Sequence, residues 1–471
     1  MKVLGHHVAL PAILLAFIDG TLFLAALYFL GFTGTCHTCV SYSATHLEFY
    51  QAVLLASAFV AITASVGVYN RDSLLDFGVF IRRFLLASQF VFIPAVAFVA
   101  IAKAMTTGPF GWYVGILSVD IAVFFAILLL LRLLLVWGTD RAFLKRRVLV
   151  LGHGDEANAV VGFISSHGGS HLRCIGHLKN GRVASNQSVG NLALQTHGDV
   201  QSAPLVLIAR SLRAEEIVIA VSDRRGLPMW QLLECKLQGI QITDYLEFWE
   251  RETGQLDLTN IGPGWLALTK GFRFNWSRRV VKRALDIAVS LAFLAVVIPI
   301  GILVGAFIAM ESPGPIFYRQ ERVGKDGKPF SIWKFRSMRT DAEDDGVPRW
   351  ASAKDDRVTR VGRVIRKLRL DEFPQVFNVL KGDMSFIGPR PERPFFVEQL
   401  RKNIPLYDLR HCVQPGITGW AQVNYRYAAS IDDAECKLAY DLYYVKNQDS
   451  ILDLMILMQT VRVFLFSHGS R

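Results

Sequence analysis

The first third of the chain is dominated by four long apolar segments. They run over residues 8–31, 47–68, 82–102 and 112–137, and each approaches the roughly 20 residues that a helix needs to cross a bilayer. We therefore expect four transmembrane helices in a domain of residues 1–140. No small-residue cleavage site follows the first segment, so we expect that segment to be retained.

The loops between these segments predict their orientation. The loop of residues 32–46 contains no lysine or arginine, whereas the loop around residues 69–83 contains Arg71, Arg82 and Arg83. The basic run DRAFLKRR follows the fourth segment. Because basic loops stay on the cytoplasmic side, both ends of the four-helix domain are expected to face the cytoplasm.

After these segments, short strand-like runs alternate with helical periodicity. The run RRVLVLGHGDEANAVVGFI is typical of a buried strand, a glycine turn and a helix. Further strand-like runs occur at PLVLIA, residues 204–209, and EIVIAV, residues 216–221. We expect a Rossmann-like α/β domain over residues 145–255, followed by a linker of residues 256–277.

The glycine turn has the spacing G-x-G-x-x-A through Gly152, Gly154 and Ala157. Such a turn directs helix amides toward a phosphate. A dinucleotide site also needs an acidic residue about 20 positions further on, and Lys179 stands in that region. We therefore interpret this domain as structural or regulatory rather than as an active dinucleotide site.

A fifth apolar segment, residues 284–310, has basic residues on both sides. A straight span would carry one basic flank across the membrane. Pro299 near its middle removes a helix hydrogen bond, so we expect a broken, re-entrant helix that returns to its starting side. The last apolar segment, residues 452–466, is too short to span and is expected to lie on the membrane surface, with a buried core helix as the alternative.

Between these apolar segments, a basic stripe ends in an acid pair. Its arginines recur every third residue, at Arg357, Arg360, Arg363, Arg366 and Arg369. This spacing predicts a basic amphipathic helix. Asp371 and Glu372 follow, and Pro374 is tolerated only near a helix start, so the pair is expected around the first turn of the next helix.

The acid pair and its surroundings favour phosphate chemistry. Adjacent carboxylates on a helix diverge, so Asp371 and Glu372 are expected to have separate roles. Nearby arginines should lower a carboxylate's pKa, which leaves it ionised as a nucleophile or as a ligand of Mg²⁺. Arg390, between two prolines in GPRPE, is expected to bind phosphate through its guanidinium, with a surface turn as the alternative.

The composition agrees with a partly membrane-embedded protein that binds anions. The 471 residues are 52% hydrophobic and carry a net charge of +11. That charge suits phosphorylated substrates, an acidic leaflet or nucleic acid, and charge alone does not choose among them. Six cysteines are too few for a disulfide framework, and the pair Cys36 and Cys39 indicates a loop disulfide or two idle thiols.

Residues 278–471 resemble the catalytic domain of bacterial polyprenyl-phosphate hexose-1-phosphate transferases, the monotopic phosphoglycosyl transferases. The matching motifs are the broken helix, SPGPIFYRQERVGKDGKPFSIWKFRSM, LDEFPQVFNVLKGDMSFIGPRPE and QPGITGWAQVN. The whole layout is similar to large members associated with exopolysaccharide synthesis. Two positions depart from the family pattern: Ile298 stands where serine is common, and Arg369 stands where a helix-capping Ser or Thr is common.

The resemblance implies a two-step transfer at the cytoplasmic face of a multi-pass protein of the bacterial inner membrane. Asp371 would attack a nucleotide diphosphosugar, with UDP as the expected nucleotide, and polyprenyl (undecaprenyl) phosphate would then accept the phosphosugar. Mg²⁺ would bridge Asp371 and the diphosphate, and Glu372 would support the dyad. The substrate-binding residues that the resemblance implies are Lys334, Arg336, Arg366, Arg390 and Glu392.

The implied partners are the nucleotide diphosphosugar, polyprenyl phosphate and membrane lipid, and no nucleic acid is expected. Small residues in the spans suggest a homodimer as a hypothesis. Two alternatives stay open. The α/β domain would be the chemical unit of a nucleotide-sugar oxidoreductase, which the missing ribose-binding acid disfavours. Otherwise the chain would be a non-catalytic membrane scaffold or regulator of polysaccharide assembly.

Overall fold

The computed structural model describes two compact units of the chain. The described residues are 2–3, 6–7, 15–25, single positions between 53 and 87, residue 130, 145–166, 172–179, 182–183, 204–272, 275–339, 357–425 and 430–465. Apart from the first seven residues, one unit runs to Glu252 and the other begins at Thr253. The four predicted transmembrane segments lie mostly outside the described residues, as do Cys36 and Cys39.

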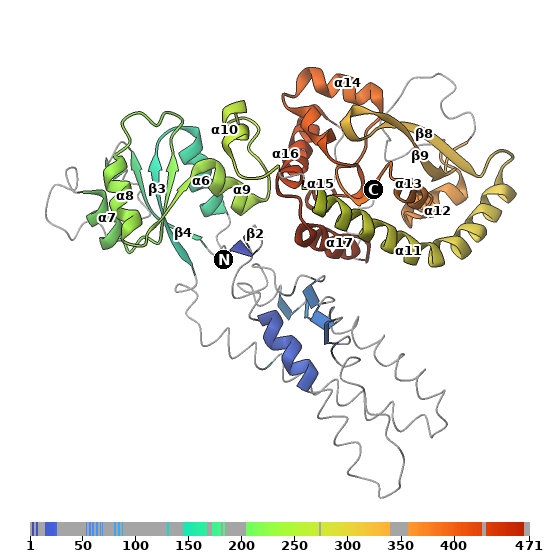
Figure 1. The fold of residues 1–471 in the computed structure, drawn as a ribbon, viewed down its shortest axis with the longest axis horizontal. Helices are drawn as coiled ribbons and strands as arrows, with labels where there is room; N and C mark the ends of the chain where they lie inside the picture. The colour runs from blue at the N-terminus through green and yellow to red at the C-terminus, as the bar shows by residue number, and fades with distance from the viewer. Residues whose placement is uncertain are drawn as a thin grey trace, which may run out of the picture. The chain divides into compact units, whose positions relative to one another are not determined.

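The first unit contains a five-stranded sheet with the order β5-β4-β3-β6-β7 (Figure 1). Its strands are β3 (Arg146–Gly152), β4 (Leu172–Lys179), β5 (Arg182–Val183), β6 (Glu216–Ala220) and β7 (Gln241–Asp244). Strands β4, β3, β6 and β7 pair in parallel in that order, and β5 pairs antiparallel with β4 at one edge of the sheet. The expected α/β architecture with a parallel sheet is confirmed. Two short strands, β1 (Lys2–Val3) and β2 (His6–His7), lie near the N-terminus.

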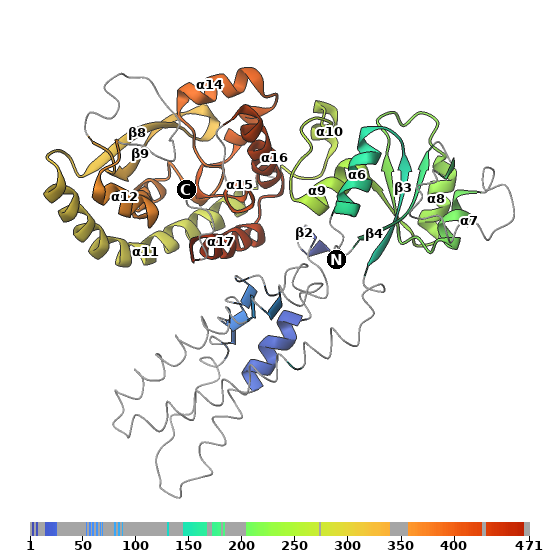
Figure 2. The ribbon, with the colours of Figure 1, turned by 180° about the vertical axis from the view of Figure 1, so that it is seen from behind.

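Helices cover both faces of this sheet (Figure 2). They are α6 (Asp155–Ser166), α7 (Leu205–Ser211), α8 (Met229–Leu237) and α9 (Tyr245–Thr253). Strand alternation directs Leu149 and Leu151 toward α7 and α8, while Val148 and Val150 pack with α6 and α9. The two hydrophobic layers make this part of the chain a three-layer α/β fold.

The predicted strand at residues 204–209 is wrong, because these residues belong to helix α7. Leu205, Val206, Ile208 and Ala209 are buried while Leu207 is exposed, which is the spacing of a helix face. The side chain of Gln231 accepts a hydrogen bond from the Leu205 amide at the helix start. A short apolar run does not distinguish a buried strand from a helix, and packing against α8 decided the outcome.

The glycine turn after β3 is required by close packing. Gly152 has φ of 151°, and a Cβ there would lie 1.8 Å from the carbonyl oxygen of Ala220. Asp155 and Glu156 occupy the first turn of α6, and their negative charges oppose an anion at that helix end. The turn therefore has a packing function that does not need a bound phosphate.

The second unit combines helices with two small sheets. Its helices are α10 (Pro263–Leu268), α11 (Trp276–Glu311), α12 (Arg360–Lys367), α13 (Gln375–Lys381), α14 (Pro394–Asn403), α15 (Trp420–Asn424), α16 (Ile431–Asn447) and α17 (Ser450–Leu465), with 3-10 turns η3 (Lys325–Gly327), η4 (Leu370–Glu372) and η5 (Tyr407–Cys412). Strands β8 (Phe317–Val323) and β9 (Pro329–Phe335) form an antiparallel hairpin, and β10 (Ser385–Ile387) pairs in parallel with β11 (Gly416–Thr418).

The longest helix, α11, is bent. Its segments Trp276–Ala295 and Val297–Glu311 meet at 55°. Pro299 has no amide hydrogen for the carbonyl of Ala295, so the bend lies where the proline removes a helix bond. Within the described part of the chain, no single helix has the length and apolar composition to cross a membrane, although the two segments of α11 together have both.

The C-terminal helix α17 has two different apolar faces. Leu452 and Ile456 are fully buried in a cluster with Tyr444 and Val445 of α16. Leu454 and Leu457 are exposed by 55% and 36%. One face of the segment is therefore core, and the opposite face offers apolar surface to the outside.

Two glycines allow the chain to approach itself next to β10 and β11. A Cβ on Gly416 would lie 2.1 Å from the Gly388 amide nitrogen and 2.6 Å from its carbonyl oxygen. Gly416→Ala should destabilise the protein by about 2 kcal/mol, because close-packed backbone cannot accommodate the added methyl group. Thermal unfolding of the purified protein measures this effect.

Gly264→Ala is the matched control, since a Cβ at Gly264 in α10 meets nothing within 4 Å. We expect the control to unfold at the wild-type temperature or slightly above it. An unchanged unfolding temperature in Gly416→Ala would contradict the close approach.

Candidate functional site

The basic helix α12 is shorter than the arginine stripe predicts. Thr359 accepts a hydrogen bond from the Gly362 amide, and Glu311 at the end of α11 accepts bonds from the amides of Arg360 and Val361 at 2.7 and 3.0 Å. Those bonds fix the helix start. A bridge between Met338 and Val358 holds the preceding chain extended, so Arg357 lies outside the helix.

Arg369 also lies outside α12, in the left-handed conformation with φ of 57°. This conformation ends the helix and turns the chain into η4. The acid pair lies in η4, one turn ahead of α13, so its expected place in the first turn of the next helix is wrong. Pro374 still marks the start of α13, at the position before Gln375.

Glu372 is held by cations from three segments. Arg390 donates hydrogen bonds to both of its carboxylate oxygens, one of them 3.3 Å long. Lys334 Nζ and Arg369 Nη1 lie 3.9 and 4.0 Å from Oε1. Burial alone would raise the pKa of Glu372, but the charges of Arg390 and Lys334 hold that pKa well below its usual value. Glu372 therefore stays ionised at neutral pH.

Asp371 has a different environment, although it is the adjacent residue. It is 9% exposed, and its Oδ1 atom has no hydrogen-bond partner among the described residues. Burial and the charge of Glu372 raise the pKa of Asp371, while the charges of Lys334, Arg366 and Arg390 oppose the rise. The expectation that neighbouring arginines leave this carboxylate with a lowered pKa is wrong for Asp371.

The free oxygen of Asp371 bears on metal binding. No group of three or more His, Cys, Asp or Glu residues suited to a metal occurs in the part of the chain that the structure describes. Mg²⁺ needs only one or two protein carboxylates when substrate phosphates and water supply the remaining ligands. A buried carboxylate oxygen without a partner fits that requirement.

Lys334 lies on β9, beside the acid pair. Burial lowers the pKa of Lys334 to about 8, although the negative charge of Glu372 opposes the shift. The ammonium group consequently loses its proton within an ordinary assay range of pH, which makes it the titratable cation of the site.

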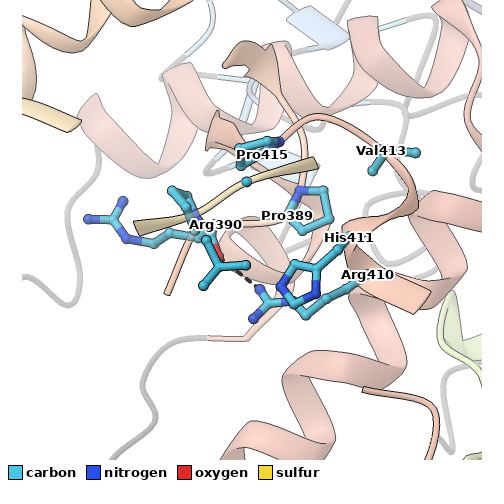
Figure 3. Close-up of a pocket in the computed structure, with 9 residues that line it drawn as sticks. Pro389, Arg390, Arg410, His411, Val413 and Pro415 are labelled. Carbon is cyan, nitrogen blue, oxygen red and sulfur yellow. Dashed lines mark hydrogen bonds between the residues drawn. The ribbon is translucent and has the colours of Figure 1, made fainter. Parts of the chain in front are cut away.

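The loop that carries Arg390 is fixed at the backbone. The Gly416 amide donates to the carbonyl of Pro389 at 2.9 Å, and Arg410 donates to the carbonyl of Arg390 at 2.8 Å (Figure 3). Arg322 on β8 donates to the carbonyl of Pro391 at 3.0 Å. The close-up shows the guanidinium of Arg390 extending away from Arg410 (Figure 3).

The remaining expected site residues lie in different places. Arg366 acts on Asp371 through its charge. Glu392 lies in the loop that carries Arg390, and its carboxylate is 3.5 Å from the guanidinium of Arg322 on β8. The guanidinium of Arg336 is buried and donates to the carbonyls of Ser312 and Pro313 after α11. These bonds make Arg336 part of the connection between α11 and the hairpin, and the structure does not bring it to the acid pair.

Sequence reasoning missed three residues: Arg410, which binds the carbonyl of Arg390, and Tyr407 and Asp441, which bind Arg410. Asp441 is buried on α16 between Leu438 and Leu442. The available signal was an acidic residue among apolar positions at helical spacing, Leu438, Leu442 and Val445. Arg410 lies in a 3-10 turn outside the quoted motifs, so its spacing gave no such signal.

A model of the bacterial sugar transferase family matches residues 277–467. The chain is 41% identical over 266 residues to UDP-N-acetylgalactosamine-undecaprenyl-phosphate N-acetylgalactosaminephosphotransferase of Aeromonas hydrophila, covering 55% of this chain and 61% of the relative. It is 31% identical over 332 residues to undecaprenyl-phosphate glucose phosphotransferase of Komagataeibacter xylinus, covering 69% of this chain and 60% of the relative.

The chain is also 39% identical over 190 residues to exopolysaccharide production protein PSS of Rhizobium leguminosarum bv. phaseoli, covering 39% of this chain and 94% of the relative. The matched regions thus span about 60% of the length of the Aeromonas and Komagataeibacter relatives and nearly all of the Rhizobium relative.

Glu372→Gln should destabilise the protein by about 1–3 kcal/mol, because Arg390 and Lys334 would lose the anion that compensates their partly buried charges. The unfolding temperature of the purified variant measures the loss. Glu398→Gln is the control, since its ion pair with Lys402 is exposed at both ends, and its effect should stay within about 0.5 kcal/mol. Equal effects of the two substitutions would contradict the central place of Glu372.

Proposed function

Because the chain belongs to the bacterial sugar transferase family, we propose that it transfers a hexose 1-phosphate from a nucleotide diphosphosugar to undecaprenyl phosphate. The observation that carries the proposal is the contrast between two adjacent carboxylates: Glu372 is bound by Arg390, and Asp371 has a buried oxygen that no described residue binds. The names of the Aeromonas and Komagataeibacter relatives support the lipid acceptor, and the Aeromonas name supports UDP as the donor nucleotide.

In the first step, ionised Asp371 attacks the sugar-linked phosphorus of the donor. A bond forms between a carboxylate oxygen and phosphorus, the bond to the bridging oxygen of the diphosphate breaks, and the nucleoside monophosphate leaves with that oxygen. Displacement at phosphorus depends mainly on positioning and on neutralising charge. Lys334, Arg366 and Arg390 supply positive charge around Asp371.

In the second step, a phosphate oxygen of undecaprenyl phosphate attacks the phosphosugar on Asp371. The bond between phosphorus and the Asp371 oxygen breaks, and the carboxylate is restored. The product is undecaprenyl diphosphate carrying the hexose. Glu372 stays ionised and holds Arg390 and Lys334 in place through both steps. Neither cation therefore has to move into position during the reaction.

Mg²⁺ fits this site as a proposed cofactor. Asp371 Oδ1 would hold it together with oxygens of the donor diphosphate. When bound, the ion supplies positive charge that offsets the charge of the leaving nucleotide.

We further propose that the chain is a multi-pass protein of the bacterial inner membrane with its catalytic unit at the cytoplasmic face. The four apolar segments would form a transmembrane helix bundle, and the α/β part would be Rossmann-like in detail. The bend in α11 supports a re-entrant helix, and exposed side chains such as Leu291, Ile302 and Phe307 suit contact with lipid. The reaction would initiate exopolysaccharide or related glycan synthesis, which the name of the Rhizobium relative supports.

Asp371→Asn should lower turnover by on the order of 10³-fold or more, because the amide oxygen is a poor nucleophile. The assay is release of nucleoside monophosphate from UDP-sugars with Mg²⁺ and undecaprenyl phosphate. The fold should persist, since Asp371 Oδ1 makes no hydrogen bond to the described residues.

Asp383→Asn controls for the change of a carboxylate to an amide, because Asp383 pairs only with exposed Lys381 among the described residues. That variant should retain wild-type turnover. Substantial turnover by Asp371→Asn would contradict a covalent intermediate on this residue.

Activity should fall as the pH rises through about 8, where Lys334 loses its proton. The protonated ammonium is the active form, because it offsets the charge of the donor diphosphate. Lys334→Arg keeps its charge at this pH and should move the alkaline limb of the kcat/KM profile upward by more than about one pH unit. An alkaline limb at the same pH in this variant would assign the titration to another group.

A further inference from the structure

A buried ion pair lies behind the loop that carries Arg390. Arg410 Nη2 and Asp441 Oδ2 are 2.8 Å apart, and their side chains are only 8% and 4% exposed. The pair joins η5 to α16, two elements that contribute no residue to the proposed reaction. Buried ion pairs are costly to form, and an apolar contact of the same volume often stabilises a protein equally well.

Arg410 connects this pair to the site. The same Nη2 atom donates to the carbonyl of Arg390 at 2.8 Å, and Nη1 donates to the hydroxyl of Tyr407 at 2.6 Å. Figure 3 shows the first of these bonds, with the two guanidinium groups extending in different directions. Asp441 and Tyr407 thus orient Arg410, and Arg410 holds the main chain of Arg390.

Arg390 is consequently fixed at both ends. Its carbonyl is bound by Arg410, and its guanidinium is bound by Glu372. The prolines on either side restrict the neighbouring backbone angles, so a displacement of the carbonyl is transmitted to the side chain. The direction in which Arg390 presents its charge therefore depends on a pair that lies away from the acid pair.

We propose that Arg410 and Asp441 are positioning residues that act through Arg390 in the phosphosugar transfer. This inference rests on the proposed function and assigns the pair a role in turnover beyond stability. Because positioning at a charged transition state depends on small displacements, loss of the pair should reduce kcat more than it changes donor affinity.

The test measures kcat and KM for the donor in Asp441→Asn. We expect kcat to fall about tenfold and KM to change by less than about twofold. In an Arg390→Lys background, the same Asp441→Asn substitution should change kcat by less than about twofold, because the group through which it acts is already altered.

Asp453→Asn is the matched control, because Asp453 forms an ion pair of 2.8 Å with Lys282 between α17 and α11. Both pairs are largely buried, so both variants should unfold at lower temperature. For the control, any effect on kcat should be equal in the wild-type and Arg390→Lys backgrounds.

Tyr407→Phe provides a second route if Asp441→Asn does not fold. It removes one acceptor of Arg410 and leaves the ion pair with Asp441, so kcat should fall about threefold, again only in the wild-type background. If whichever of Asp441→Asn and Tyr407→Phe folds lowers kcat equally in both backgrounds, this inference is overturned and the proposed function is unaffected. A folded wild-type protein without turnover on any nucleotide sugar would overturn the proposed function and this inference with it.

Discussion

The pairing of Glu372 with Arg390 separates two adjacent carboxylates into different electrostatic environments. Glu372 is fixed as an anion by Arg390 and Lys334, and its negative charge in turn contributes to the raised pKa of Asp371. The cations around the pair oppose that rise, so the pKa of Asp371 reflects both its burial, which favours the protonated form, and the nearby positive charge, which favours the ionised form. Glu372 thereby gathers the positive charge of Arg390 and Lys334, while Asp371 has a buried oxygen without a hydrogen-bond partner among the described residues.

The surrounding fold holds the parts of this pair in position. Glu311 at the end of α11 caps the start of α12, so the bent helix is joined to the N-terminal end of the basic helix that leads into η4. The loop that carries Arg390 is fixed by the close approach of the Gly388 and Gly416 backbones. Lys334 arrives on the hairpin formed by β8 and β9. Elements far apart in the sequence therefore meet around Glu372.

Local patterns were sufficient to predict the α/β unit, the central part of the basic helix and Arg390 beside the acid pair, whereas Lys334 was expected only from the family resemblance. They failed where tertiary packing decides. The run at residues 204–209 became helix α7 because its apolar positions pack against α8, and the pKa of Asp371 depends on burial that the sequence does not display. Arg410 stayed hidden for the same reason, since its role arises from a contact with the carbonyl of Arg390.

Isotope exchange tests the covalent route through Asp371 most directly. Labelled nucleoside monophosphate is incubated with the donor, Mg²⁺ and the protein, in the absence of undecaprenyl phosphate. If Asp371 takes up the phosphosugar before the lipid acts, the label should enter the nucleotide diphosphosugar, because the first step reverses without an acceptor. Net transfer to added lipid without any exchange in its absence would contradict the account and favour direct attack by the lipid phosphate.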